Sequence, residues 1–350
     1  MNTVTVSASK TYQVHIGSSL LPQIGAYISK IHPQCKVAII SDSNVWPIYG
    51  ELISRSLNDT GYTSVHYVLP AGEESKNPQQ YISILNFLAE NAVTRSDLLI
   101  ALGGGVVGDI TGFAAATYLR GVSYVQVPTS LLAMVDSSVG GKTAIDLPAG
   151  KNLVGAFYQP EMVLCDISVL KTLPDEIFID GCAEVIKYGI LFDADLFAHL
   201  TVNGLQFDRE YVISRCVALK ADVVCADEFD KGLRQQLNLG HTVGHSIEKN
   251  SQFAVSHGRA VAIGMAVAAK ASAGCGFCEQ NVWETIVATI KKFGLPTDTD
   301  FSAEKLSDGA LSDKKRLGDT VHFVLPRNIG DGFLHPVSTK DLTSFIEKGL

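Results

Sequence analysis

Three histidines lie close together in the second half of the chain. His241 and His245 are four residues apart, which places both imidazoles on one face of a helix. The next histidine in the sequence is His257. Catalytic zinc commonly has three protein ligands, often two histidines and a carboxylate. Glu184 is a candidate carboxylate because it is a charge in an otherwise apolar helix. Spacing alone pairs His241 with His245, and hydrogen-bonded core histidines are the competing interpretation.

Several cations lie in apolar or glycine-rich surroundings, although the net charge of the chain is −8. They are Arg120, Lys142, Lys151, Lys187, Lys220 and Arg234. Arg and Lys bind phosphate and carboxylate groups, so the set indicates an anionic ligand. For any single member, an ordinary salt bridge is the alternative. The acidic balance lacks the basic footprint of a nucleic-acid-binding protein.

A glycine-rich segment at 103–108 satisfies the pattern G-x-G-x-x-G between an expected strand and an expected helix. Glycines there let the backbone approach a pyrophosphate at a helix N-terminus. The usual acidic residue about 20 positions later is missing, and Asp42 after an earlier strand is the nearest substitute. The segment therefore predicts a dinucleotide site of a different layout, with a tight strand-to-helix turn as the alternative.

A second glycine motif, Gly140-Gly-Lys-Thr143, looks like the end of a P-loop. The P-loop pattern requires a glycine five positions before Gly141, where this chain has Asp136. This mismatch excludes that class of nucleotide triphosphatase.

The two halves of the chain differ in their apolar pattern. Strands are expected at 36–41, 62–69, 97–102 and 123–127, a helix at 78–91, and an edge hairpin over the first sixteen residues. This alternation predicts a mostly parallel sheet with helices on both faces. Beyond residue 173 the apolar spacing is helical, for example at 183–188, 213–226 and 260–273, with a short strand pair near 320–326.

Cysteine usage and the N-terminal segment indicate a cytoplasmic protein. The chain has seven cysteines, an odd number, and most lie in apolar segments, which suits a reducing compartment. The lone pair Cys275 and Cys278 is interpreted as packing thiols rather than a metal or redox site. We expect no signal peptide, because the first ten residues alternate like a strand and contain neither a basic nor an apolar region. We expect no membrane helix, because the longest uncharged stretch, 11–29, contains polar residues, glycine and proline.

Taken in order, the motifs of this sequence resemble those of the 3-dehydroquinate synthase family over roughly residues 42–315. The matching segments are 72–76, 103–109, 118–121, 135–143, 151–152, 183–187, 237–245, 257–258 and 313–315. The resemblance implies a Rossmann-like α/β domain over 1–173 and an all-α C-terminal domain over 174–350, with the active site in the cleft between them.

The resemblance also implies an activity. The expected reaction converts 3-deoxy-D-arabino-heptulosonate 7-phosphate to 3-dehydroquinate and phosphate, a lyase step of the shikimate pathway. It proceeds by transient oxidation, phosphate elimination, re-reduction and intramolecular aldol closure. The implied cofactors are NAD+ and one divalent metal, Zn2+ or Co2+, and members are commonly homodimers.

Site residues follow from the same resemblance. The implied metal ligands are Glu184, His241 and His257, which replaces the pairing drawn from spacing and assigns His245 to the substrate. The implied NAD+ residues are Asp42, Asn44, Glu73, Lys76, Gly104, Gly105, Val106, Asp109, Thr129, Ser130, Lys142, Lys151 and Thr172. The implied catalytic and substrate residues are Arg120, Asp136, Lys142, Asn152, Lys187, Lys220, Arg234, Asn238, His245 and Lys314.

Three alternatives and three departures accompany these expectations. The alternatives are another sugar phosphate cyclase, a metal-dependent NAD polyol dehydrogenase, and a non-catalytic binding protein on the same scaffold. The departures are Arg259 and Asp230, where the family often has Glu, and Ser130, where it often has Thr. We expect Arg259 to point away from the metal and to pair with another acid.

Overall fold

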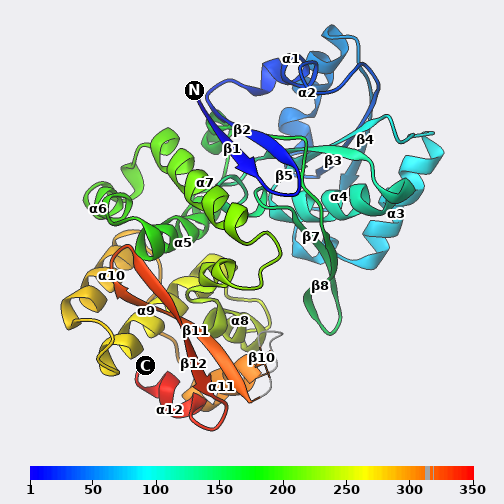
Figure 1. The fold of residues 1–350 in the computed structure, drawn as a ribbon. Helices are drawn as coiled ribbons and strands as arrows, with labels where there is room; N and C mark the ends of the chain where they lie inside the picture. The colour runs from blue at the N-terminus through cyan, green and yellow to red at the C-terminus, as the bar shows by residue number, and fades with distance from the viewer. Residues whose placement is uncertain (312–315, 318) are drawn as a thin grey trace. The chain divides into compact units, whose positions relative to one another are not determined.

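The computed structural model describes residues 1–311, 316–317 and 319–350. The chain forms two compact units, which are described separately (Figure 1). The first unit consists of Met1–Leu173 and Arg209–Phe229, and the second of Pro174–Asp208 and Asp230–Leu350. In the described part of the chain, every helix is too short or too polar to cross a membrane.

A seven-stranded sheet forms the centre of the first unit. Its strands are β1 (Asn2–Ser7), β2 (Thr11–Gly17), β3 (Lys36–Asp42), β4 (Thr63–Leu69), β5 (Leu98–Gly103), β6 (Ser123–Pro128) and β9 (Met162–Asp166). They lie in the order β1-β2-β9-β6-β5-β3-β4. Only the β1–β2 pair is antiparallel in this sheet, as expected for an N-terminal hairpin at an edge. The strands predicted from apolar runs are confirmed to within a residue or two.

Helices cover this sheet and connect its parallel strands. They are α1 (Ile24–Ile28), α2 (Trp46–Asp59), α3 (Pro78–Glu90), α4 (Gly105–Thr117) and α7 (Arg209–Ala226), with short helical turns η1 (Leu21–Gln23), η2 (Glu73–Ser75), η3 (Tyr118–Arg120), η4 (Ala133–Ser137) and η5 (Ile167–Lys171). The start of α3 is fixed by its sequence, because the Asn77 side chain accepts a hydrogen bond from the Gln80 amide at 2.8 Å and Pro78 follows the cap. All six residues of β5 are buried, as expected for a central parallel strand.

A separate hairpin follows η4 and was not predicted. Its strands β7 (Lys142–Leu147) and β8 (Gly150–Phe157) pair antiparallel and form their own two-stranded sheet. Lys142, Lys151 and Asn152 lie on this hairpin. The hairpin therefore carries three of the residues expected to bind ligands.

The second unit is mainly helical. Its helices are α5 (Asp175–Phe192), α6 (Ala194–Asn203), α8 (His241–Asn250), α9 (His257–Gly274), α10 (Gln280–Lys292), α11 (Ala303–Leu311) and α12 (Leu342–Glu347), with the turns η6 (Gly204–Gln206) and η7 (Leu233–Asn238). A small antiparallel sheet adds β10 (Arg316–Leu317), β11 (Thr320–Asn328) and β12 (Asp331–Ser338). The expected strand pair is β11 with β12, so the unit is helical without being purely α.

Helix α9 is the buried centre of the second unit, and two glycines let it approach its neighbours. A Cβ on Gly264 would lie 1.9 Å from the Gly240 carbonyl oxygen, just before α8. A Cβ on Gly258 would lie 1.9 Å from the Asp180 carbonyl oxygen on α5. Since real Cβ atoms do not approach oxygen so closely, both positions require glycine. The first contact places the start of α8 against the middle of α9, and the second places the start of α9 against α5.

The expected division at residue 173 differs from the structure at one helix. Helix α7 lies in the 174–350 half of the sequence but belongs to the first unit, where it packs against β1, β2 and η4. Figure 1 shows α7, in green, beside the blue strand β1. The Met1 amino group pairs with Glu210 at 2.8 Å, and the Asn2 side chain donates to Ser214 at 3.1 Å. Helical periodicity reveals a helix, but not which sheet or bundle it packs on.

Candidate active site

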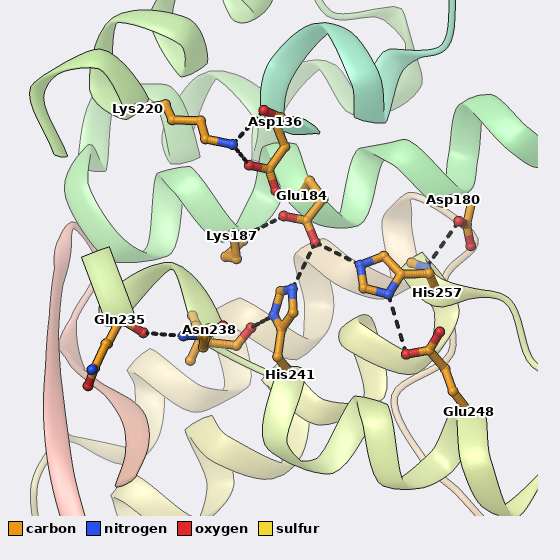
Figure 2. A network of polar contacts seen from close by, with 12 residues as sticks. Asp136, Asp180, Glu184, Lys187, Lys220, Gln235, Asn238, His241, Glu248 and His257 are labelled. Carbon is orange, nitrogen blue, oxygen red and sulfur yellow. Dashed lines mark hydrogen bonds and ion pairs between the residues drawn. The ribbon is translucent and has the colours of Figure 1, made fainter. Parts of the chain in front are cut away.

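Two imidazoles and one carboxylate converge in the second unit. Glu184 on α5 is fully buried, and its Oε1 lies 3.6 Å from His241 Nε2 and 3.5 Å from His257 Nε2. His241 is the first residue of α8 and His257 the first of α9. Figure 2 shows the carboxylate directed at both rings. The three candidate ligand atoms lie within 4.8 Å of one another, close enough to share one metal ion.

The geometry and the polar atoms of this cluster fit a divalent metal. Glu184 Oε1 is buried and has no hydrogen-bond partner among the described residues. A buried carboxylate oxygen without a partner is costly unless it binds a cation. Zinc at about 2.0–2.2 Å from each ligand in a tetrahedron separates its ligand atoms by about 3.3–3.6 Å, which matches the two separations measured here. Carboxylate oxygen and imidazole nitrogen are also the ligand types that zinc takes.

The second nitrogen of each ring has its own acceptor. His241 Nδ1 lies 3.0 Å from the Leu239 carbonyl oxygen, and His257 Nδ1 lies 3.4 Å from Glu248 Oε2. A proton on Nδ1 leaves the Nε2 lone pair of each ring available to a metal. Burial by itself lowers the pKa of His257, but the carboxylates of Glu184 and Glu248 outweigh burial and raise the pKa to about 10. The same negative charges favour a metal cation beside the ring.

Asp180 holds the start of α9 in place. Its carboxylate accepts hydrogen bonds from the backbone amides of Gly258 at 3.0 Å and Arg259 at 3.1 Å, and from the Ser256 hydroxyl. A carboxylate at a helix N-terminus satisfies unpaired amides and interacts favourably with the helix dipole. Asp180 and Glu184 are one helical turn apart on α5. One face of α5 therefore both anchors α9 and presents a carboxylate to its first residue.

The remaining expected residues of the second unit have the following surroundings. Lys187, one turn after Glu184, is buried and pairs with Glu184 Oε2. Arg234 on η7 is buried as well. The His245 ring lies 5.5 Å from that of His241 and 6.3 Å from that of His257, centroid to centroid. Asn238, at the end of η7, donates from its side chain to the Gln235 carbonyl. Lys314 lies outside the described residues.

In the first unit, the residues expected to bind NAD+ follow the carboxyl ends of parallel strands. Asp42 ends β3 and Asn44 follows it, Glu73 and Lys76 follow β4, Gly104 to Asp109 follow β5, Thr129 and Ser130 follow β6, and Thr172 follows β9 and η5. Carboxyl ends of parallel strands meet at one edge of the sheet, which is where open α/β sheets bind their ligands. Five separate segments thus reach the same edge.

Local contacts shape this edge. Gly104 caps α4, and Gly105 and Val106 begin it, so the amides at the helix start are available to an anion. The Thr129 amide donates to the Gly103 carbonyl at 2.9 Å, which ties the end of β6 to the end of β5. Asp42 Oδ1 accepts from the amides of Asn44 and Val45 and so orders the turn into α2.

Lys76 connects this edge to the β7–β8 hairpin. Its ammonium donates to Asp109 Oδ2 at 2.6 Å and to Asn152 Oδ1 at 2.5 Å. Burial alone would lower the pKa of Lys76, but Asp109 and Glu73 outweigh it and raise the pKa above its usual value. Lys151 Nζ lies 3.9 Å from Glu73 Oε1. The structure thus brings residues expected at the NAD+ site into contact with one expected at the substrate site.

Other expected residues of the first unit are placed as follows. Lys220 on α7 pairs with Asp136 in η4. Arg120 is exposed and has a φ of 66°, next to Leu119 at 50°, so two non-glycine residues adopt the left-handed conformation. Lys142 begins β7 and is exposed. The left-handed conformations of Leu119 and Arg120 cost free energy, and such backbone outliers occur often at functional sites.

Sequence reasoning missed three residues that organise these clusters. Glu248 contacts the His257 ring, and Asp180 contacts the backbone at the start of α9. The Tyr49 hydroxyl contacts Thr172 Oγ1 at 2.6 Å. Glu248 could have been identified from its spacing, because it lies three residues after His245 and seven after His241, on the same helical face. The contacts of Asp180 and Tyr49 join segments far apart in sequence, and no local pattern announces them.

The departures from the family pattern lie outside the metal cluster. The Arg259 side chain is exposed and forms no ion pair with the described residues, so the expected acidic partner is not found among them. Asp230 has a φ of 59°, and its carbonyl accepts from Gln235. Ser130 Oγ accepts from the Ala133 amide at 3.3 Å, a contact that a Thr hydroxyl could also make.

Comparison with known proteins places both halves of the chain in one family. Residues 66–180 match the family model "3-dehydroquinate synthase N-terminal", and residues 181–316 match "3-dehydroquinate synthase C-terminal". A curated relative from Clostridium acetobutylicum, named 3-dehydroquinate synthase, is 44% identical over 342 residues, covering 96% of each chain.

Two solved structures have a similar fold. One is 2-deoxy-scyllo-inosose synthase complexed with carbaglucose-6-phosphate, NAD+ and Co2+, with a TM-score of 0.89, 25% identity and full coverage of both chains. The other is 2-epi-5-epi-valiolone synthase from Streptomyces hygroscopicus with NAD+ and Zn2+ bound, with a TM-score of 0.89 and 25% identity, covering 99% of this chain and 98% of the other.

Proposed function

The chain belongs to the 3-dehydroquinate synthase family, and we propose that it converts 3-deoxy-D-arabino-heptulosonate 7-phosphate to 3-dehydroquinate and phosphate. The observation that supports this activity most directly is the convergence of Glu184, His241 and His257 in a chain that matches the family over nearly its full length. The reaction is a carbon–oxygen lyase step of the shikimate pathway.

The proposed cofactors are NAD+ and one divalent metal, Zn2+ or Co2+. When bound, NAD+ accepts and returns a hydride and the metal polarises the reacting hydroxyl groups. Glu184, His241 and His257 would hold the metal. The start of α4 and the segments beyond β3, β4, β6 and β9 would hold NAD+.

The protein's own cations would bind and orient the substrate, which carries both a phosphate and a carboxylate. We assign the phosphate to Lys142, Asn152, Lys187, Arg234 and Lys314. Lys220 and Arg234 are both candidates for the carboxylate. Anchoring the two anionic ends selects one rotamer of the substrate, in which the phosphate oxygen itself accepts the neighbouring C6 proton.

The assignments of Arg120, Asp136, Asn238 and His245 to the substrate belong to the same proposal. Asp136 orients Lys220 through their ion pair. Asn152 is oriented by Lys76. In both pairs a polar side chain is held by a partner within its own unit, which lowers the entropy cost of binding.

Two features of the protein's setting are also proposed. The family resemblance favours a homodimer. The free cysteines favour a reducing cytoplasm. Sedimentation of the purified protein at several concentrations tests the dimer.

Phosphate release from 3-deoxy-D-arabino-heptulosonate 7-phosphate tests the activity. The assay supplies NAD+, is run with and without a metal chelator, and follows NADH absorbance in parallel. We expect phosphate release that requires metal and NAD+ with no net NADH, since the hydride returns to the product.

Other results would assign the protein differently. Net NADH without phosphate would identify a polyol dehydrogenase. Phosphate released only from a sugar phosphate that lacks a carboxylate would identify another cyclase of this fold. Absence of NAD+ and metal binding would leave a non-catalytic protein.

A further inference from the structure

Glu248 is a buried carboxylate that the proposed reaction does not use. It lies on α8, is 3% exposed, and directs Oε2 at His257 Nδ1, 3.4 Å away (Figure 2). Burying a carboxylate is costly unless it is partnered. A residue kept at such a cost, in contact with a candidate metal ligand, calls for a chemical reason.

The two candidate imidazole ligands are oriented in the same way. In each ring Nε2 faces Glu184 Oε1, and Nδ1 faces an oxygen acceptor on the opposite side. For His241 the acceptor is the Leu239 carbonyl, and for His257 it is Glu248. A neutral imidazole that binds a metal through Nε2 must carry its proton on Nδ1. An acceptor at Nδ1 therefore fixes both the tautomer and the plane of the ring.

The second acceptor differs from the first in charge. A carbonyl only accepts the Nδ1 proton, whereas a carboxylate also places a negative charge behind the ring. Such a charge increases the basicity of the ligand and attracts the metal. Since His257 begins α9 and retains about a third of its side-chain exposure, its ring has less packing around it than the ring of His241, which is 11% exposed. The more exposed ring is the one held by the charged partner.

A second metal is the main competing explanation. His245, Glu248 and His257 also place ligand atoms within 4.8 Å of one another. A metal there would bind His257 through Nδ1 while the first metal binds Nε2, so the ring would have to lose both protons. A neutral ring can serve only one of the two sites. The Glu184 oxygen, which has no hydrogen-bond partner among the described residues, favours the first site.

We propose that Glu248 is a positioning residue that holds His257 in its metal-binding tautomer and orientation through an Nδ1–H···Oε2 hydrogen bond. This inference rests on the proposed metal site of Glu184, His241 and His257. Glu248 would not touch the metal, but it would influence how tightly the protein binds the metal.

The test compares Glu248→Gln with the wild-type protein and a matched control. Asp193→Asn is the control, because Asp193 is a buried carboxylate of the same unit that caps α6 and lies outside the three-ligand set. The zinc dissociation constant is measured by competition with a chromogenic chelator, and the zinc content per chain is determined. The visible spectrum of the cobalt-loaded protein reports the geometry and basicity of the ligands.

We expect Glu248→Gln to weaken zinc binding about 10- to 100-fold, as is typical for partners of metal-ligating histidines, and to shift the cobalt bands. Asp193→Asn should leave both unchanged. If Glu248→Gln does not fold, Glu248→Asp replaces it. The shorter side chain withdraws the carboxylate by one methylene and lengthens the contact with His257, which should also weaken zinc binding.

Two results would overturn the inference. One is wild-type zinc affinity and an unchanged cobalt spectrum in the Glu248 variant. The other is two zinc ions per wild-type chain with one lost in the variant, which would make Glu248 a ligand itself. A wild-type protein that binds no zinc would instead overturn the proposed metal chemistry, and this inference with it.

Discussion

The two oxygens of Glu184 face groups of different kinds. Oε1 faces two imidazole nitrogens and has no hydrogen-bond partner among the described residues, while Oε2 pairs with the Lys187 ammonium. In the proposed site, one carboxylate would bind a metal with one oxygen while it positions a cation with the other. Substitutions on the two sides of this carboxylate should therefore have different effects.

On the imidazole side, we expect His241→Ala to lose the metal and to lower kcat/KM about 1,000-fold or more, because Lewis-acid assistance contributes several kcal/mol to such reactions. The fold should survive, as circular dichroism would show. Arg259→Glu is a charge-reversing control next to His257, and its exposed side chain predicts little change in zinc affinity. A large gain in zinc retention in that control would contradict the expected outward placement of Arg259.

On the cation side, Lys187→Met should keep the metal and lose turnover. Methionine fills a similar volume, and a bound metal balances the charge of Glu184 once the ammonium is gone. Loss of one preorganised cation at the substrate predicts a fall in kcat of about 100- to 1,000-fold. Zinc content and kcat are measured on the same sample. Full activity would mean that Lys187 does not bind the phosphate.

At this scale the residue types were predictable and their partners were not. Spacing identified His241 and His245 because helical periodicity places them on one face. Glu184 was a candidate carboxylate because it is a charge in an apolar helix, and His257 was the third clustered histidine. Only the family resemblance, however, replaced the His241–His245 pairing by the set Glu184, His241 and His257. Glu184 and His257 come from α5 and the start of α9, and a one-dimensional pattern has no information about which helix ends meet.

Among the elements, the start of α9 determines whether the cluster forms. Asp180 caps this helix, and the absence of a side chain at Gly258 lets it approach α5. His257 is carried on the same turn. The position of one proposed metal ligand is therefore controlled by the contact between two helices.

Substitution of Gly258 by alanine should move α9 away from α5. The added Cβ would overlap the Asp180 carbonyl oxygen, which we expect to cost about 1–3 kcal/mol of stability and to weaken zinc binding by separating His257 from Glu184. Gly274→Ala is the matched control at the other end of α9, where the nearest atoms would lie 3.7 Å away. Zinc affinity and urea unfolding are measured for both. Equal zinc affinity in the two variants would show that this contact does not set the ligand geometry.

Most elements of the first unit were predictable because buried parallel strands are short apolar runs between turn residues. The β7–β8 hairpin was not, since its segment was examined as a phosphate-binding motif. Helix α7 was assigned to the helical half because periodicity carries no information about tertiary partners. The first error concerns whether an element exists, and the second concerns where an element packs.

For the whole molecule, the two units should respond to different ligands. The chain has two tryptophans, Trp46 at the start of α2 in the first unit and Trp283 on α10 in the second. Trp46 also stacks on His66 with centroids 4.1 Å apart. Single-tryptophan variants therefore report the unfolding of each unit separately.

Zinc should stabilise the unit that Trp283 reports. At a thousand times its dissociation constant, a ligand adds about 4 kcal/mol to the unit that binds it, which corresponds to a rise in Tm on the order of 10 °C. Trp46→Phe isolates the Trp283 signal, and Trp283→Phe isolates that of Trp46. We expect a chelator to lower the Tm that Trp283 reports. The Tm that Trp46 reports should instead rise when NAD+ is added. Zinc dependence confined to the Trp46 signal would refute the placement of the metal.

The return of the chain to the first unit at α7 has a consequence for synthesis. When residue 173 leaves the ribosome, the sheet is complete, but the helix that packs against β1 and β2 has not been translated. Residues 174–208, which belong to the other unit, emerge first. The nascent first unit therefore exposes apolar surface during this interval, when a ribosome-associated chaperone would bind it, and truncating the gene after codon 173 would not yield an independent folding unit.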